Sequence, residues 1–387
     1  MSKRVAILTG GGDVPGLNMV IKGFVARMEE AGHEVVGLRR GWASLLNVHP
    51  DPAADNSQWV VELTRASTRT IDRSGGTVLH TSRINPEIMK PESVPAHLQA
   101  RAAPTDAKGR LDFTAAALEV LEFLRIDALV AVGGDGTLSF ANRLHREGVK
   151  VIGVPKTMDN DVFGTDYCIG FSTAVTRSVN FINDLRTAAG SHERFLVVEL
   201  FGRYPGETCL LSSYLAGTDR ALIAEVPFEP LALVEMLAED KRSNPSNYAV
   251  VAISEGAHAV GSGRTQSGEA DAVGNRELGG VGRVLRTALE THTRERVIYQ
   301  RLGYLMRSGP PDALDRLVAS NFATLAADLM LAGQTGQLVA ILGGRYSTVP
   351  IETVCAGSKN VDVERFYDRE RYRPNIVGVM GLPMFLH

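Results

Sequence analysis

Short runs of apolar residues alternate with stretches of helical spacing along most of the chain. The apolar run 5–8 is followed by a glycine-rich turn, and apolar residues then recur at helical spacing through 17–31. A second apolar run at 33–38 completes a strand–loop–helix–strand unit. Strands joined through helices lie parallel, in a sheet that helices cover on both faces. The pattern therefore predicts an α/β fold.

The same unit recurs further along the chain. The same criteria predict two more helices, at 113–124 and 138–147, and five more strands, at 127–132, 149–154, 195–200, 221–226 and 248–253. In parallel sheets of this kind, ligands bind at the carboxyl ends of the strands. Polar motifs that directly follow these strands are therefore the first candidates for a functional site.

Composition excludes several classes of protein. The chain has 387 residues, enough for two or three domains of about 100–200 residues. Its 44% hydrophobic content excludes a largely disordered chain, and its net charge of −3 argues against a protein that coats nucleic acid or an anionic membrane. No apolar stretch reaches the length of about 18 residues that a membrane helix needs. The three cysteines, Cys168, Cys209 and Cys355, form no zinc pattern, and we expect a cytoplasmic protein with reduced thiols.

Two glycine-rich segments directly follow predicted strands. The first, 10–18, leads into a helix, and the second, 133–137, follows the strand 127–132. Small residues let backbone amides approach phosphate oxygens, and a helix N-terminus adds positive partial charge. Asp135 in the second segment adds a carboxylate of the kind that binds Mg²⁺. Both segments indicate a site for a nucleotide phosphate chain, with a tight structural turn as the alternative.

A segment with two aspartates follows the strand 149–154. It carries Lys156, Thr157, Asp159 and Asp161. Paired aspartates can divide the work of a general base and an orienting group, and a lysine can hold the charge of a phosphoryl group in transfer. A capped turn is the alternative interpretation.

Arginines and one further acid lie beside strand ends and glycine loops. They are Arg83, Arg194, Arg203, Arg307 and Glu255. A single arginine is most often a solvated surface residue. Several of them beside glycine loops indicate clamps for phosphate oxygens.

Taken together, these motifs resemble the phosphofructokinase family. The similar segments occur in the family's order between residue 5 and about residue 316, as GGGDVPGLN, GGDGT, PKTMDND, GFSTA, FGRYPGE, SEG and LGYLMRSGPPDALDR. The resemblance implies an α/β fold of two Rossmann-like lobes with mainly parallel sheets covered by helices and the active site in the cleft between them. We expect a donor-binding lobe of residues 1–171 plus about 307–345, and a sugar-phosphate lobe of 172–306 plus about 346–387.

The resemblance also implies roles for single residues. Asp159 would be the general base on the sugar 1-hydroxyl, with Lys156 and Arg83 stabilising the moving phosphoryl group and Asp135 associated with Mg²⁺. The donor would be bound by Gly11, Arg83, Gly134, Gly136 and Thr137. Fructose 6-phosphate would be bound by Thr157, Asp161, Arg194, Phe201, Gly202, Arg203, Glu255, Arg301, Tyr304 and Arg307.

Arg194 is usually lent by a neighbouring subunit in this family, which implies a homodimer or homotetramer with a shared active site. Phe201 stands where the family usually has Met, and Tyr304 where many bacterial ATP-dependent members have His. Arg296 and Arg301 both lie near the position of a further family arginine, and the sequence does not choose between them.

The phosphoryl donor depends on few positions. Pyrophosphate users of the family carry a second aspartate where this chain has Gly136, and a carboxylate there would repel a nucleotide. Lys156 occurs in pyrophosphate users and in some ATP users, and Phe140 would narrow an adenine pocket. The expected reaction is transfer from Mg-ATP to fructose 6-phosphate, as in glycolysis, with a reversible pyrophosphate-dependent transfer as the alternative.

Two further alternatives are weaker. Lipid kinases and NAD kinases also carry GGDGT, but the remaining motifs disfavour them. A non-catalytic paralogue that only binds sugar phosphate is disfavoured by the presence of Asp135, Asp159 and Asp161.

Overall fold

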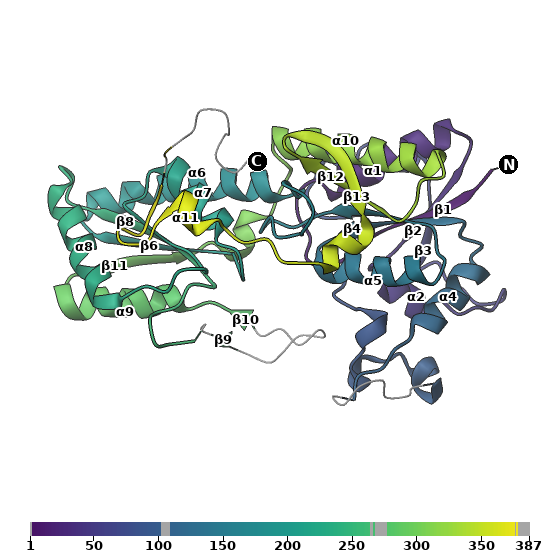
Figure 1. Cartoon of the computed structure of the whole chain (residues 1–387), viewed down its shortest axis with the longest axis horizontal. Coiled ribbons are helices and arrows are strands. Elements are labelled where there is room, and N and C mark those ends of the chain that lie inside the picture. The colour runs from purple at the N-terminus through teal and green to yellow at the C-terminus, as the bar shows by residue number, and fades with distance from the viewer. Residues whose placement is uncertain (1, 102–108, 264–265, 268–276, 376, 378–387) are drawn as a thin grey trace.

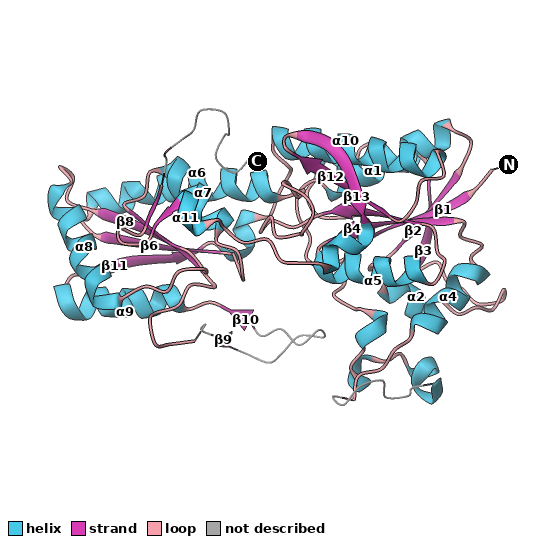
Figure 2. Cartoon of the chain, in the orientation of Figure 1, coloured by secondary structure: helices cyan, strands magenta, loops and turns pink. Residues whose placement is uncertain are grey.

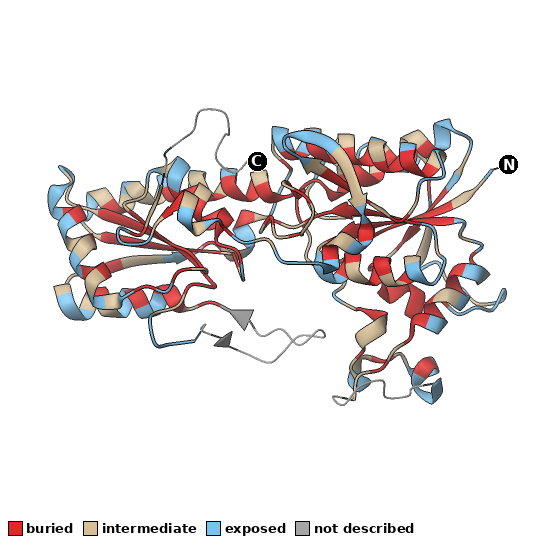
Figure 3. Cartoon of the chain, in the orientation of Figure 1, coloured by how far each residue is buried: buried red, intermediate tan, exposed pale blue. Residues whose placement is uncertain are grey.

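Two mainly parallel sheets, each covered by helices on both faces, form two lobes that lie side by side (Figures 1 and 2). The computed structural model describes residues 2–101, 109–263, 266–267, 277–375 and 377. The central strands of both sheets, β1, β4, β5, β6 and β8, are almost entirely buried, as Figure 3 shows, in keeping with their continuous apolar sequences. The fold class expected from the sequence is confirmed.

The first lobe is built on a seven-stranded sheet in the order β13-β12-β5-β4-β1-β2-β3. Its central strands run parallel, and β3 and β13 pair antiparallel at the two edges. The bounds are β1 Arg4–Thr9, β2 Glu34–Leu38, β3 Val60–Leu63, β4 Ala128–Gly133, β5 Val151–Pro155, β12 Gln337–Leu342 and β13 Arg345–Pro350.

Helices cover both faces of this sheet. Helices α1 and α10 pack on one face, and α2, α4 and α5 pack on the other. The bounds are α1 Leu17–Glu30, α2 Ala43–Asn47, α3 Arg65–Thr68, α4 Thr114–Phe123, α5 Asp135–Arg146 and α10 Ala313–Leu331. Short 3₁₀ turns complete this lobe at η1 Ile71–Arg73, η2 Pro86–Ile88, η3 Pro91–Ser93, η4 Ala96–Arg101 and η6 Ile351–Cys355.

The second lobe is built on a four-stranded parallel sheet in the order β11-β6-β8-β7. Its strands are β6 Phe195–Leu200, β7 Arg220–Leu222, β8 Ala249–Ser254 and β11 Val297–Arg301. Its helices are α6 Phe171–Ser191, α7 Glu207–Ala216, α8 Pro230–Ser243, α9 Val281–Thr293 and α11 Val363–Phe366. Small elements are the 3₁₀ turn η5 Gly303–Met306 and the antiparallel pairs of β9 Gln266–Ser267 with β10 Glu277–Leu278 and β14 Tyr367–Asp368 with β15 Arg373–Pro374.

One apolar core runs through both lobes. The inward side chains of β1 in the first lobe and of β6 in the second belong to the same buried cluster. Helices α1, α10 and α6 connect them with residues such as Phe24, Phe322 and Ile182. Among the described residues, no helix is both long enough and apolar enough to cross a bilayer.

The chain crosses back to the second lobe near its C-terminal end. We call residues 356–362 the C-terminal strap; they lead from η6 to α11 and appear in yellow in Figure 1. Strand β13 belongs to the sheet of the first lobe, and η6 packs on α5. We therefore propose that the first lobe extends to about residue 355, beyond the limit near 345 expected from the sequence.

Several strands differ from the sequence expectation. Strands β3, β11 and β13 were not predicted, because they are short, partly polar or exposed at a sheet edge. Strand β12 was also missed, although residues 338–342 form a continuous apolar run that the same criteria could have detected. The strand expected at 221–226 ends at Leu222, after which the chain turns so that Glu225 accepts hydrogen bonds from the amide of Gly206.

Candidate active site

A cavity of about 270 Å³ opens at the carboxyl ends of β1, β4 and β5. Arg203, which follows β6 of the second lobe, also lines it, so residues of both lobes meet here. The lining residues are Gly11, Gly12, Ser82, Arg83, Ile84, Asn85, Gly134, Asp135, Gly136, Thr137, Lys156, Thr157, Asp161 and Arg203. Of these, Gly12, Ser82, Ile84 and Asn85 were not named as site residues from the sequence. Gly12, Ser82 and Ile84 directly adjoin Gly11 or Arg83, and Asn85 lies two residues after Arg83.

The glycine turn after β1 forms one wall of the cavity. Gly11 has a φ of 79°, a conformation that favours glycine. The ammonium group of Lys156 donates a hydrogen bond of 2.7 Å to the carbonyl oxygen of Gly12. A Cβ atom at Gly12 would collide with the guanidinium group of Arg307. The absence of side chains here thus lets two cations approach the backbone that faces the cavity.

The second glycine segment is the first turn of a helix. Helix α5 begins at Asp135, three residues before the expected start at 138, because its first turn carries no apolar residue that the periodic pattern could detect. Free amides of this turn and the helix dipole point toward the cavity. The indole of Trp42 donates to the carbonyl oxygen of Thr137 at 3.2 Å and fixes the turn from behind.

Gly136 leaves open space in this turn. No atom lies within 4 Å of the position that a Cβ would occupy, and its φ is not in the left-handed region. Local backbone geometry therefore does not require glycine at 136, and the space belongs to the cavity.

Phe140 does not narrow the cavity, contrary to the expectation from the sequence. Its side chain is fully buried, and its ring packs edge-to-face on Trp42 at 5.0 Å between centroids. The residue lies on the apolar face of α5, which turns toward the sheet. It therefore has no bearing on which donor fits.

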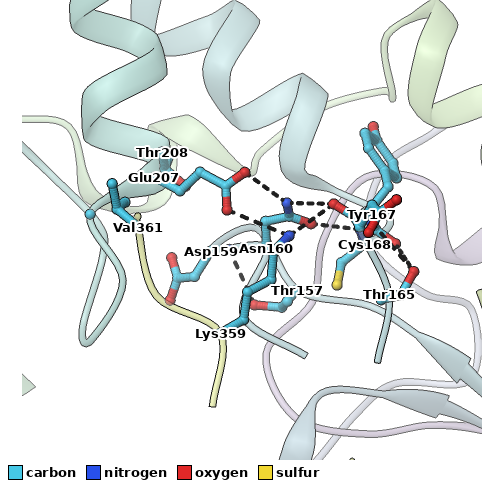
Figure 4. Close-up of polar contacts among 12 residues, drawn as sticks. Thr157, Asp159, Asn160, Thr165, Tyr167, Cys168, Glu207, Thr208, Lys359 and Val361 are labelled. Carbon is cyan, nitrogen blue, oxygen red and sulfur yellow. Dashed lines mark hydrogen bonds and ion pairs between the residues drawn. The ribbon is translucent and has the colours of Figure 1, made fainter. Parts of the chain in front are cut away.

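The loop after β5 carries Asp159, which Figure 4 shows, and Asp161, which lines the cavity. Asn160 between them has a φ of 57° and is fully buried. The hydroxyl of Thr157 accepts a hydrogen bond of 3.2 Å from the amide of Asp159. Among the described residues, no donor reaches Oδ1 of Asp159, although this oxygen is buried. Such a buried orphan acceptor indicates a bound group that supplies the missing donor.

Burial and like charges perturb the acids and the lysine of the site. Burial, with Asp161 and Glu255 nearby, raises the pKa of Asp159, and burial also raises the pKa of Asp161. Burial raises the pKa of Glu255 to about 7. Burial and the neighbouring Arg307 lower the pKa of Lys156 to about 8. The pKa values of buried acids and of a buried lysine are thus shifted toward neutral pH, as is common for residues of catalytic sites.

Asp135, which the sequence assigned to the metal, and Asp161, which it assigned to the sugar phosphate, both line the cavity and could together bind a divalent cation. Partial burial and the Asp161 carboxylate raise the pKa of Asp135, and water reduces this effect because the side chain remains exposed. The described residues contain no group of three or more metal-binding side chains. Two carboxylates that repel each other suit Mg²⁺, which keeps several waters and takes further oxygens from phosphates.

Arginines and aromatic rings line the side of the second lobe. Arg307 lies 4.8 Å from the ring centre of Tyr304 and 5.8 Å from that of Phe201, and the two rings pack edge-to-face. Arg301 lies 6.0 Å from the ring centre of Phe201 and approaches Glu255 with an N–O distance of 3.3 Å. Two guanidinium groups thus lie close to the ring of Phe201, and Nε of Arg307 is buried without an acceptor among the described residues.

Gly202 connects this group to Arg203. It has a φ of 143°, and its carbonyl oxygen accepts a hydrogen bond of 2.6 Å from the hydroxyl of Ser254. The turn aims Arg203 into the cavity.

Arg194 lies away from the cavity of its own chain. It directly precedes β6, whereas Arg203 follows the same strand, so a strand of about 20 Å separates them. Arg296 directly precedes β11, which pairs with β6 in the register Val297 to Phe195. Arg194 and Arg296 are therefore neighbours at the edge opposite the cavity, while Arg301 lies at the cleft.

Comparison with known proteins gives a consistent result. The family model described as Phosphofructokinase matches residues 4–330. A pyrophosphate–fructose 6-phosphate 1-phosphotransferase of Dictyoglomus thermophilum is 37% identical over 95% of this chain and 98% of its own length. An ATP-dependent 6-phosphofructokinase 2 of Streptomyces coelicolor is 34% identical over 95% of this chain and 99% of its own length.

Solved structures agree on the fold. A pyrophosphate-dependent phosphofructokinase from Marinobacter aquaeolei superimposes with a TM-score of 0.74 at 19% identity, covering 96% of this chain and 88% of that one. A Pichia pastoris phosphofructokinase in the T-state gives a TM-score of 0.73 at 24% identity, covering 92% of this chain and 36% of that one. The family expected from the motifs is thereby confirmed: the chain belongs to the phosphofructokinase family.

Proposed function

We propose that this protein transfers a phosphoryl group from Mg-ATP to the 1-hydroxyl of fructose 6-phosphate, giving fructose 1,6-bisphosphate. The observation that carries the proposal is the buried, unpartnered Oδ1 of Asp159. It lies between a glycine-lined cavity suited to phosphates and the arginine group of the second lobe. A hydroxyl that attacks phosphorus needs such a positioned acceptor for its proton.

The residues divide the chemistry in the following way. Asp159 accepts the proton of the sugar hydroxyl, and its raised pKa makes it a stronger base than an ordinary aspartate. Lys156 and Arg83, both in the cavity wall, stabilise the charge of the phosphoryl group in transfer. A Mg²⁺ ion held by Asp135 and Asp161 would neutralise the phosphate oxygens of the donor.

The same scheme assigns binding roles around this centre. Gly11, Gly134, Gly136 and Thr137 bind donor phosphates, with Gly134 capping the N-terminus of α5. Thr157, Phe201, Gly202, Arg203, Glu255, Tyr304 and Arg307 surround the sugar phosphate. Arg301 lies at the cleft and forms an ion pair with Glu255. Arg296 lies beside Arg194 at the opposite edge of the sheet, and we assign it, with Arg194, to the sugar phosphate of a neighbouring subunit.

Gly136 favours ATP as the donor. The open space beside it gives a nucleotide access that a carboxylate would deny, and Phe140 does not obstruct that space. Pyrophosphate is the second candidate, because relatives of comparable identity are named for either donor. Lys156 is compatible with both.

We further propose a homo-oligomer in which Arg194 serves the active site of the neighbouring subunit. A single chain leaves this arginine at the far edge of its own sheet, where it contributes nothing to its own cavity. Dimer and tetramer both satisfy this requirement. The cytoplasmic location expected from the sequence stays a prediction.

The experiment that tests the function is a comparison of initial rates with fructose 6-phosphate and Mg²⁺, using ATP and pyrophosphate in parallel. Turnover with ATP alone supports Gly136 as the residue that decides the donor. Turnover with pyrophosphate alone refutes the ATP assignment and leaves the phosphotransfer mechanism in place. No turnover with either donor refutes the proposed function.

A further inference from the structure

The C-terminal strap contacts the loop that carries Asp159. The ammonium group of Lys359 donates a hydrogen bond of 2.8 Å to the carbonyl oxygen of Asp166, near the end of this loop. It also lies 3.5 Å from Oε2 of Glu207, the first residue of α7 (Figure 4). One lysine from the C-terminal part of the chain thus joins two segments that lie far from it in sequence.

Asn160 completes a closed ring with these groups. Its amide nitrogen donates to the carbonyl oxygen of Asp166 at 2.9 Å and to Oε1 of Glu207 at 3.1 Å. Its side-chain oxygen accepts from the amide of Cys168 at 2.8 Å. Lys359 and Asn160 therefore both donate to the carbonyl oxygen of Asp166, and each contacts a different carboxylate oxygen of Glu207.

This ring fixes the residue between Asp159 and Asp161. Asn160 adopts a left-handed backbone conformation, which asparagine tolerates better than other residues with a side chain, and its three side-chain hydrogen bonds hold it in this position. On the other side of Asp159, the hydroxyl of Thr208 donates to the carbonyl oxygen of Met158 at 2.9 Å. The first turn of α7 thus holds both neighbours of Asp159 in the chain.

The carboxylate of Glu207 needs the lysine. Its side chain is 7% exposed, and burial raises its pKa, whereas Lys359 and Asn160 lower it. A buried carboxylate without a cation would be strongly destabilised or would take up a proton. Lys359 opposes this effect of burial and favours the ionised form of Glu207, which accepts a stronger, charge-assisted hydrogen bond from Asn160.

The strap has a second attachment to the same helix end. The amide of Val361 donates to Oε1 of Glu225 at 3.0 Å, and Glu225 also accepts from the amide of Gly206, which caps α7. Two points of the strap, two residues apart, are therefore fastened to the α7 N-terminus. This arrangement fixes the position of Lys359 along the strap.

We propose that Lys359 is a positioning residue for the loop after β5. Through Glu207 and Asn160, Lys359 orients the carboxylate of Asp159 toward the sugar hydroxyl. The proposal rests on the proposed function for the role of Asp159 itself. The strap comes from η6 of the first lobe, and Glu207 belongs to the second lobe. The orientation of Asp159 therefore also depends on how the two lobes are placed relative to each other.

The test compares Lys359→Met, which keeps the length of the side chain and removes its charge, with Lys359→Arg and with Lys150→Met at an exposed site. For Lys359→Met we expect kcat to fall by about 10- to 100-fold, as for other residues that orient catalytic groups, with the KM for fructose 6-phosphate within about threefold. Lys359→Arg restores most of kcat, and Lys150→Met behaves as the wild type. Loss of thermal stability in Lys359→Met with unchanged kcat would overturn the proposal.

A second measurement does not depend on turnover. Amide hydrogen exchange of the loop 157–168 in the full-length protein is expected to speed up in Lys359→Met and to stay at the wild-type rate in Lys150→Met. Unchanged exchange in this loop refutes the positioning role, even if the wild type proves inactive with both donors. Wild-type inactivity with accelerated exchange in the variant would refute the proposed function and leave the structural coupling of Lys359 intact.

Discussion

Replacing Gly136 with aspartate adds one carboxylate to the cavity and tests whether its absence lets the protein use ATP as the donor. The substitution meets no steric obstacle, since no atom lies within 4 Å of the new Cβ and the backbone is not left-handed. An acidic residue in the first turn of α5 interacts favourably with the helix dipole, and leaving glycine improves helix propensity. We therefore expect Gly136→Asp to fold, with a melting temperature equal to or above that of the wild type.

The charge, in contrast, should act strongly on a nucleotide. If a carboxylate in this space came within about 5 Å of a phosphate oxygen of the nucleotide, their repulsion at an effective dielectric constant of about 20 would cost about 3 kcal/mol per pair of unit charges. This corresponds to a loss of more than about 100-fold in kcat/KM for ATP. Gly136→Asn adds almost the same volume without the charge, and we expect it to lose about tenfold or less.

The assay is the initial rate with each donor at several concentrations, for the wild type and both variants. An ATP rate in Gly136→Asp within about threefold of the wild type would refute the electrostatic reasoning. Equal losses in the aspartate and asparagine variants would show that shape, and not charge, decides access to the cavity.

Four further predictions concern other residues of the chain. Asp159→Asn should lower kcat by about 10²- to 10⁴-fold with little change in the KM for fructose 6-phosphate, which steady-state kinetics will measure. Because the pKa of Asp159 is raised, kcat/KM of the wild type should fall as pH drops through and below neutrality, and a rate that stays flat down to about pH 5 would contradict this assignment. Glu255 has a pKa of about 7 against an ordinary 4.5, so the folded ligand-free protein binds a proton that the unfolded chain releases; its stability should fall by up to about 3 kcal/mol as pH rises through this range, measured by thermal melts. Purified hybrid dimers of an Asp159→Asn and an Arg194→Ala subunit should recover about half of the wild-type activity at low fructose 6-phosphate, and hybrids no better than the parents would exclude a shared site.

The glycine turn, the aspartate loop and their parent strands could be predicted because each is a local pattern of strand, turn and helix. The start of α5 at Asp135 could not, since its first turn has no apolar residue to mark it. The burial of Phe140 was available from the sequence, because Leu144 lies four residues on and shares its face. The exposed edge strand β13 has too few buried positions to give a pattern.

Other features of the site were beyond any local pattern. Lys359 and Glu207 are separated by most of the second lobe in sequence, and only the path of the strap brings them together. Arg194 and Arg296 lie next to each other because β6 pairs with β11. Strand β11 has too many polar residues for the apolar pattern to reveal it as a strand. Long-range contacts of this kind follow from topology and not from composition.

The apolar core that passes through α6 from one sheet to the other has a consequence for how the protein unfolds. Val175 and Ile182 of α6 are buried members of the cluster that includes side chains from the sheets of both lobes. Separating the lobes would expose this surface to water at a cost of about 25 cal/mol per Å². Thermal or denaturant melting should then follow one cooperative transition, and either half expressed alone would expose this apolar surface and should aggregate.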